Sequence, residues 1–187
     1  MKRLLHAGVL GAVFVAVMAG AGPADVDVYV TCEGAAPAYR AETIASAIFR
    51  RAGVTVVWHA WYGRGTVSAM ALRVNLAERT PGDRLPGALG VCYPYADRSR
   101  SITVFCDRIR RSANRNPALE SALLAHVLVH EITHVITGVD RHSASGMMKA
   151  HWDAADHDAM VEAPLPFSEV DLILIHQRLN KAQAANR

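Results

Sequence analysis

Apolar and polar residues follow two different periods along the chain, and these periods predict strands and helices. The segment 26–31 (VDVYVT) alternates as a strand does, and VTVVWHAW at 54–61 predicts a second strand. Between them, the segment 37–53 places apolar residues at helical spacing and stops at Gly53, which predicts a helix. Because strand, helix and strand follow one another at this spacing, we expect a βαβ unit with parallel strands.

The middle of the chain predicts three more strands. Residues 68–78 form the third predicted strand, and the Pro- and Gly-containing segment 79–90 predicts a loop. The segment between Cys92 and Cys106 predicts a hairpin with a polar tip, which supplies the other two strands. Pro94 lacks an amide hydrogen for a sheet ladder, so we expect the first strand of this hairpin to lie at an edge of the sheet.

The C-terminal half predicts helices. Asn116 has the character of an N-cap, Pro117 suits the first helical position, and Gly138 suits a left-handed C-cap. Between these signals lies a long helix that is apolar on most sides and therefore predicted to be buried. We expect 139–166 to be irregular, and 167–183 to form an amphipathic helix capped by Ser168.

Length and composition fit one globular domain. The chain has 187 residues, of which 51% are hydrophobic and 20% charged, which is ordinary for a folded protein. Together the elements predict an α+β fold: a mixed twisted sheet of about five strands with a backing helix, a long central helix and a C-terminal helix. We expect this single domain to span 25–187.

Residues 1–24 have the pattern of an export signal. A basic start at Lys2 and Arg3 precedes an apolar run over 7–19 and then small residues. The run is short for a membrane span, so we expect a cleaved signal peptide and a secreted or periplasmic protein without stable membrane association. An uncleaved N-terminal anchor is the alternative interpretation.

Charge and cysteines narrow the picture further. Removing Lys2 and Arg3 lowers the formal net charge from +3 to +1, and no basic cluster interleaved with aromatics remains, so nucleic-acid binding is not indicated. We expect a monomer with a solvated surface at the arginines between 108 and 115. In an oxidising compartment, antiparallel pairing around Ser99 would bring Cys92 and Cys106 together, so we predict a disulfide between them, with Cys32 left over.

The segment HEITHVITGVDRH, from His130 to His142, carries the candidate chemistry. His130 and His134 are one helical turn apart and project from one face of the predicted long helix. Two imidazoles at that spacing suit zinc, and Glu131 is placed to act as a general base on a metal-bound water without being a ligand. A chance match of this motif is disfavoured because a buried His–Glu–His cluster without a metal would be costly.

The motif resembles that of the metzincin zinc metallopeptidases, in which HExxH is followed by a glycine, a third histidine and a methionine in a tight turn. Here these are Gly138, His142 and Met147 or Met148. The resemblance implies that His142 is the third ligand of one catalytic zinc ion, and that an edge strand pairs with an extended peptide or protein substrate. The specific resemblance covers 130–148 only.

The spacing departs from the family pattern by one extra residue on each side of Gly138. The added helical residue rotates the exit of the chain by about 100°, and the added loop residue spans up to about 3.5 Å, which is enough to bring the His142 ring back. Met147 and Met148 could also be simple core residues. The competing third ligands are His151, Asp153, His157, Glu162 and Glu169, the glutamates being the gluzincin alternative.

Other histidines and aromatics have simpler interpretations. His126 extends the histidine stripe by one turn, but we expect it to pack or to hydrogen-bond near the helix start. His151 or Trp152 could contribute to a substrate cleft. Glu169 is better explained as a first-turn carboxylate of the last helix.

The sequence therefore predicts an exported zinc metalloendopeptidase that hydrolyses peptide bonds through a zinc-bound water activated by Glu131. Zinc would be held by His130, His134 and His142. Three alternatives stay open at this point. They are a non-catalytic zinc-stabilised binding module, a gluzincin-type peptidase with a downstream glutamate ligand, and a zinc hydrolase that acts on another kind of amide.

Overall fold

The computed structural model describes residues 24–32, 38–61, 71–82, 85–94 and 100–185, which form a five-stranded sheet and five helices. This confirms the predicted α+β class. The expected signal segment lies outside the described residues except for Ala24, so it stays a prediction. In chain order the elements are β1 (Ala24–Cys32), α1 (Ala38–Arg51), β2 (Val54–Ala60), β3 (Leu72–Ala77), β4 (Gly90–Cys92), β5 (Ser101–Phe105), α2 (Cys106–Ala113), α3 (Pro117–Thr137), α4 (Ala154–Glu162) and α5 (Glu169–Ala185).

The sheet has the strand order β2-β1-β3-β5-β4. β1 is parallel to β2 and to β3, β3 is parallel to β5, and β4 alone among these strands is antiparallel to its neighbour β5. The parallel pairing of β1 and β2 around α1 confirms the predicted βαβ unit. The position of β4 at the edge confirms the expectation drawn from Pro94.

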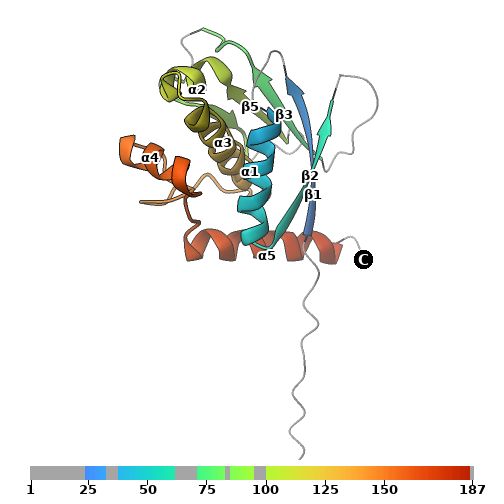
Figure 1. Ribbon diagram of the computed structural model, residues 1–187. Helices are drawn as coiled ribbons and strands as arrows, with labels where there is room; N and C mark the ends of the chain where they lie inside the picture. The colour runs from blue at the N-terminus through green and yellow to red at the C-terminus, as the bar shows by residue number, and fades with distance from the viewer. Residues whose placement is uncertain (1–23, 33–37, 62–70, 83–84, 95–99, 186–187) are drawn as a thin grey trace, which may run out of the picture.

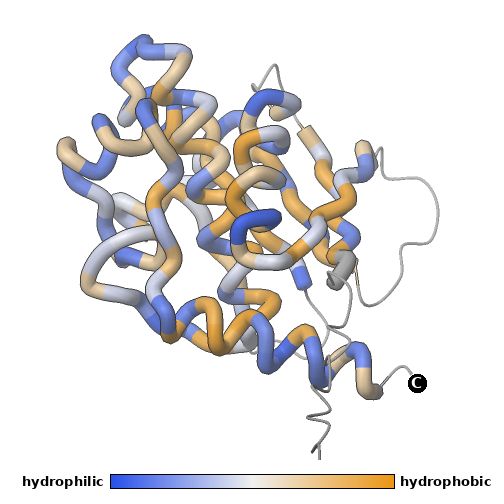
Figure 2. The backbone as a smooth tube through the Cα atoms, turned by 60° about the horizontal axis from the view of Figure 1, so that its bottom comes forward, coloured by the Kyte–Doolittle hydropathy of each residue, from blue (hydrophilic) through white to orange (hydrophobic). Residues whose placement is uncertain are grey.

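The hydrophobic core lies between the sheet and helices α1 and α3. Figure 1 shows α1 and α3 side by side over one face of the sheet, with α5 running across their lower ends. The alternating pattern of the strands points Val28, Leu72 and Val104 into this core, where each is fully buried. Along α5, hydrophobic and hydrophilic turns alternate (Figure 2), and the fully buried Ile175 lies on its inner side. The helix predicted over 167–183 is confirmed, but its sides are not cleanly apolar and polar, because Val170 and Ile173 are exposed whereas Asp171 is buried.

Helix α3 is the central element, and local signals set both of its ends. The Asn116 side chain accepts hydrogen bonds from the amides of Ala118 and Leu119, Pro117 occupies the first turn, and Gly138 ends the helix with a left-handed φ of 66°. By length and hydropathy alone α3 could cross a membrane, but 83% of its most apolar window is buried inside the fold. Such burial is typical of the core helix of a globular protein.

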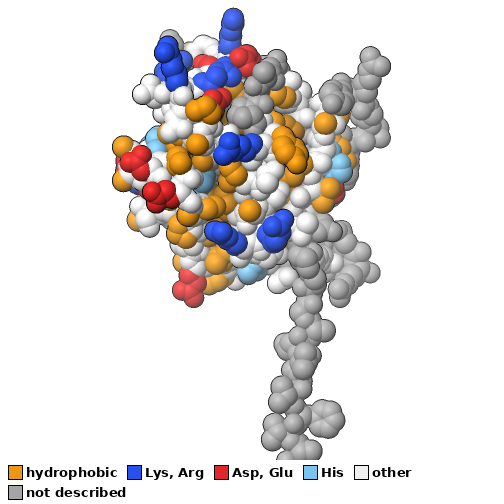
Figure 3. All heavy atoms as spheres, in the orientation of Figure 1, with side chains coloured by type: hydrophobic (Ala, Val, Ile, Leu, Met, Phe, Trp, Pro, Cys, Tyr) orange, Lys and Arg blue, Asp and Glu red, His pale blue; other side chains and the backbone are white. Residues whose placement is uncertain are grey.

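Two helices depart from the sequence predictions. α2 was not predicted, because only its arginines were considered, as solvated surface. Arg111 is indeed exposed and Arg110, which pairs with Glu78 at 2.7 Å, is partly exposed, but the helix buries Ile109 and Ala113 on its other side. Figure 3 shows its basic side chains at the top of the molecule. α4 lies inside the region expected to be irregular. It forms because Asp153 and Asp156 make a reciprocal capping box at its start.

The predicted disulfide between Cys92 and Cys106 is wrong. In the β4–β5 ladder Cys92 faces Ile102 and Gly90 faces Val104, so the strands pair in a different register from the one centred on Ser99. Cys106 therefore lies beyond the end of the ladder, at the first residue of α2, and is buried. All three cysteines, each within the described ranges, are thiols.

Candidate metal centre

The first two histidines of the motif lie on one buried face of α3. His130 and His134 are only 8% and 4% exposed, and their rings meet edge to face with centroids 4.7 Å apart. Their Nε2 atoms are 3.0 Å apart. The i, i+4 spacing therefore brings two imidazole nitrogens to one point, as the sequence predicted.

Backbone carbonyls determine which nitrogen of each ring is free for a ligand. His130 Nδ1 lies 3.0 Å from the carbonyl oxygen of Met147, and His134 Nδ1 lies 2.8 Å from that of Val139. Because a carbonyl oxygen only accepts, both Nδ1 atoms carry the hydrogen, and both Nε2 atoms present lone pairs. Two lone pairs facing each other at 3.0 Å repel unless a cation or a proton lies between them.

This arrangement fits a metal ion. Two nitrogen ligands on tetrahedral zinc are separated by about 3.3 Å, given Zn–N distances of about 2.0–2.1 Å, which is close to the spacing of the His130 and His134 Nε2 atoms. The exposed His142 completes the set, and one nitrogen from each of the three rings lies within 4.8 Å of the other two. An approach of the His142 ring by at most about 1.5 Å would bring it from this 4.8 Å limit to the ligand spacing of about 3.3 Å.

The electrostatics of the helical pair also favour metal binding. Burial, together with the neighbouring His134 and His142, lowers the pKa of His130 to about 4. Burial also lowers the pKa of His134 below its ordinary value. Both rings are therefore neutral at physiological pH, which is the protonation state that binds metals.

A short loop brings His142 back to His130 and His134, although the chain has one more residue on each side of Gly138 than the metzincin motif has. The chain leaves α3 at Gly138, and an isolated bridge then pairs Ser143 with Lys149. Met147 and Met148 are buried beneath the histidines, at 0% and 2% exposure. The contact from this turn to the site is made by the Met147 carbonyl, which orients His130.

The competing ligands lie outside the three-histidine cluster. Asp153 caps α4 and pairs with Lys149 at 2.7 Å, Glu162 is exposed at the end of α4, and Glu169 is exposed in the first turn of α5. His151 and His157 line the neighbouring pocket. His126 has the packing role expected of it: its ring bonds the Ala122 carbonyl through Nδ1 at 2.7 Å and accepts the Leu165 amide at Nε2 at 3.1 Å.

Glu131 lies beside the histidines but outside the ligand set. It is 9% exposed, and burial raises the pKa of its carboxyl group to about 7, while a hydrogen bond from the Cys92 thiol opposes the rise. Gly90 in β4 faces this side chain so closely that an added Cβ atom would lie 3.0 Å from Glu131 Cγ. A carboxyl group with a pKa near neutrality is suited to exchanging protons at physiological pH.

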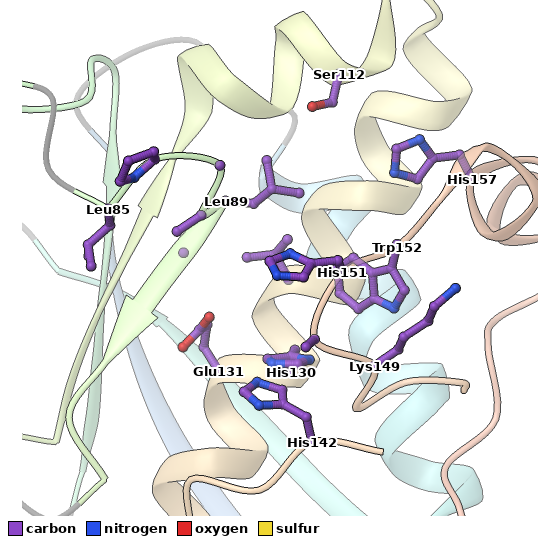
Figure 4. A pocket seen from close by; sticks show the side chains of 16 residues that line it. Leu85, Leu89, Ser112, His130, Glu131, His142, Lys149, His151, Trp152 and His157 are labelled. Atoms are coloured by element: carbon purple, nitrogen blue, oxygen red, sulfur yellow. The ribbon is translucent and has the colours of Figure 1, made fainter. Parts of the chain in front are cut away.

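A pocket of about 460 Å³ opens beside His130, His142 and Glu131 (Figure 4). His151 and Trp152, which the sequence suggested for a cleft, do line it. Arg108 fixes the opposite wall, because its Nη1 atom donates hydrogen bonds to the carbonyls of Leu85 and Ala88, both at 2.6 Å. The pocket is lined by residues 85–90 before and within β4, by Ser112, Val127, His130, Glu131 and His142, and by Lys149, Ala150, His151, Trp152 and His157.

Sequence reasoning missed two residues around the centre. Asp171 contacts the loop that carries His142. Cys92 reaches Glu131 from the edge strand. These contacts join segments that are far apart in the chain, so no local sequence motif predicts them.

Comparison with known proteins leaves the site to be interpreted on its own geometry. No protein-family model matches the chain, and no curated protein matches it significantly in sequence. The three histidines brought together on α3 and its following loop are compatible with a zinc site, and they form a possible metal-binding cluster.

Proposed function

We propose that this protein is a zinc-dependent metalloendopeptidase of the zincin type, similar to the metzincins. One observation carries the proposal: a buried glutamate, Glu131, lies in an open pocket beside three converging histidines without belonging to their cluster. A structural metal site has no use for a base at that position. A hydrolytic site requires one.

The three histidines would hold the ion, and the fold prepares them for it. His130 and His134 are fixed in ring orientation and tautomer by the carbonyls of Met147 and Val139, and His142 would be the third ligand. Zinc, when bound, would supply a Lewis acid that polarises the scissile carbonyl and makes water a better proton donor. Three protein ligands leave a fourth position for this chemistry.

Glu131 would move the proton. In its ionised form the carboxylate accepts a proton from the attacking water, and in its protonated form it donates that proton to the departing amine. Burial holds the pKa of Glu131 near 7, so both forms are accessible near neutral pH. Glu131 would therefore act as both general base and general acid.

The pocket wall supports a peptide as the substrate. β4 lies at the edge of the sheet, and its Gly90 lines the pocket beside Glu131. An extended peptide could add to this edge by backbone hydrogen bonds, which recognise any sequence, and its side chains would enter the pocket. This arrangement favours an endopeptidase over a hydrolase of small amides.

We also propose that the protein acts outside the cytoplasm, on the basis of the signal-like pattern in 1–24. N-terminal sequencing of the protein recovered from the medium or periplasm of the producing cell tests this. A new N-terminus near Ala24 is expected. An intact Met1 on an intracellular protein would contradict it.

The decisive experiment is Glu131→Gln. The wild type is first assayed on casein and on peptide libraries, with zinc content measured by elemental analysis. The variant should keep its zinc, because Glu131 is not a ligand, and should lose about 10²–10⁴-fold in peptide hydrolysis, the usual contribution of a general base. Glu162→Gln and Glu169→Gln are matched controls on exposed carboxylates, and both should keep zinc and activity.

Two results would overturn the proposal, and a third would change its ligand set. Undiminished hydrolysis in a zinc-loaded Glu131→Gln protein would remove the base from the mechanism. A zinc-loaded wild type that cleaves no substrate would favour the non-catalytic binding module. Loss of zinc in Glu169→Gln would restore the gluzincin alternative.

A further inference from the structure

Asp171, in the first turn of α5, is a buried carboxylate that gathers polar groups from two segments. It is only 3% exposed. It accepts hydrogen bonds from the Ser168 amide at 3.0 Å and the Ser168 hydroxyl at 2.6 Å, which fix the start of α5. It also accepts from Arg141 Nη1 at 2.5 Å and from the Ser143 hydroxyl at 3.0 Å, both on the loop after α3.

Arg141 and Ser143 are the two residues that flank His142 in the chain. The His142 ring itself is exposed, so packing does not hold it as it holds His130 and His134. The side chains of the residues on either side of His142 instead donate hydrogen bonds to one carboxylate, that of Asp171. Because these bonds are charge-assisted, they are among the stronger polar contacts in a protein.

The same part of the chain also holds the other end of the loop. The Met147 amide donates to the Pro166 carbonyl at 2.8 Å, while the Met147 carbonyl orients His130. Gly146, with a left-handed φ of 78°, allows this close approach, since an added Cβ atom would lie 2.4 Å from the Pro166 oxygen. The segment 166–171 thus anchors both ends of the loop beneath the three histidines.

We propose that Asp171 is a positioning residue of the metal centre, and that it sets the location of His142 through Arg141 and Ser143. The proposal rests on the proposed metal site but is independent of hydrolysis. Loss of a partner outside the direct ligands typically weakens metal binding by about 10–100-fold. The asparagine side chain keeps the shape of aspartate but removes the charge that holds Arg141, so Asp171→Asn should show a loss of this size.

The test is a double-mutant cycle on zinc affinity, measured at neutral pH by competition with a chromophoric chelator. The proteins are the wild type, Asp171→Asn, His142→Ala and the double variant. If Asp171 acts through His142, the double variant should bind zinc within about twofold of His142→Ala alone. A carboxylate that merely stabilises the fold would lower affinity in both backgrounds.

The matched control is Asp107→Asn. Asp107 is also a first-turn helix carboxylate with a side-chain partner, Thr80, and it lies in α2, away from the loop. It should leave zinc affinity unchanged. Cobalt substitution supplies a second readout, because the visible spectrum of bound cobalt should change in Asp171→Asn as it does in His142→Ala.

Each outcome decides the proposal. Wild-type affinity in a folded Asp171→Asn protein would overturn it and leave the metal site standing, as would an undiminished effect of Asp171→Asn in the His142→Ala background. A wild type that binds no zinc would overturn the metal site and this inference together. If Asp171→Asn does not fold, Ser143→Ala and Arg141→Gln carry the same cycle from the loop side.

Discussion

A Cβ atom placed on Gly90 would lie 3.0 Å from Glu131 Cγ and 3.1 Å from Glu131 Oε1. The edge strand therefore touches the proposed base directly and limits where its carboxylate can lie. The nearest atom to that Cβ is Val127 Cγ1, at 2.9 Å, so Gly90→Ala should displace both Val127 and Glu131 by a few tenths of an ångström. Because these three nearest atoms belong to Val127 and Glu131 and to no histidine, the variant should keep its zinc while peptide hydrolysis falls by about 10-fold or more, since small misplacements of reacting groups are costly.

Zinc content and hydrolysis measured on the same Gly90→Ala preparation check this prediction. Leu85→Ala is a suitable control, because Leu85 lines the same pocket and its side chain is 46% exposed. Equal activity of Gly90→Ala and wild type would mean that the carboxylate position is not set by β4.

The third ligand can be separated from its competitors by zinc affinity. His142→Ala should weaken zinc binding strongly, because it removes one of three nitrogen ligands. His151→Ala and His157→Ala remove rings that line the pocket but lie outside the cluster, so both should bind zinc as the wild type does. A chelator competition on the three variants decides the matter, and a neutral His142→Ala would exclude it as a ligand.

Buried histidines should make the metal-free protein less stable in acid. Burial lowers the pKa of His126, whereas in the unfolded chain a histidine takes up its proton near pH 6.5. Below about pH 6.5 the unfolded state therefore binds more protons, and the free energy of unfolding falls as pH falls. His130 and His134 act in the same direction. Glu131 acts in the opposite direction: because burial raises its pKa, the folded state binds a proton at this carboxyl group more readily than the unfolded state does.

Comparing wild type with His126→Gln isolates one of these groups. Between about pH 6.5 and the lowered pKa of the folded state, the wild type should lose up to about 1.4 kcal/mol per pH unit more than the variant. Urea unfolding in the presence of a chelator, repeated at several pH values, measures both slopes. Parallel slopes would mean that His126 titrates alike in the folded and unfolded states.

The cysteines should behave as thiols. Unfolded protein prepared without reductant should release three equivalents with a thiol reagent, since Cys32, Cys92 and Cys106 form no disulfide. In the folded protein Cys106 should react slowly, because burial raises its pKa to about 11 and the thiolate is the reactive form. A count of one thiol per chain would instead show that two of the cysteines form a disulfide.

Local signals predicted much of the fold, and long-range contacts account for what they missed. The caps of α3 at Asn116 and Gly138 depend on a few neighbouring residues and were predicted correctly. The register of β4 on β5 depends on how β5 sits against β3, so a hairpin centred on Ser99 could not be tested from the hairpin alone. The predicted disulfide depended on that register.

The two missed helices and the missed anchor have different physical causes. α2 is rich in arginine and has only a narrow apolar side, so its sequence resembles that of an exposed loop. In α4 only Met160 is buried, so its pattern carries almost no helical period, and its capping residue Asp153 had been considered as a metal ligand. Asp171 meets its loop partners across 28 and 30 residues. The spacing of apolar and polar residues along the chain does not predict contacts over such a separation.

The anchoring of the histidine loop by 166–171 has a consequence for the order in which the molecule is assembled. A chain is synthesised from its N-terminus, and all three histidines emerge before Pro166 and Asp171 do. Until α5 has been made, a nascent chain carries every ligand but lacks the contacts that arrange the third one. We therefore expect the proposed metal site to reach full affinity only in the completed chain, and a protein truncated after Leu165 to bind zinc more weakly than the full chain does.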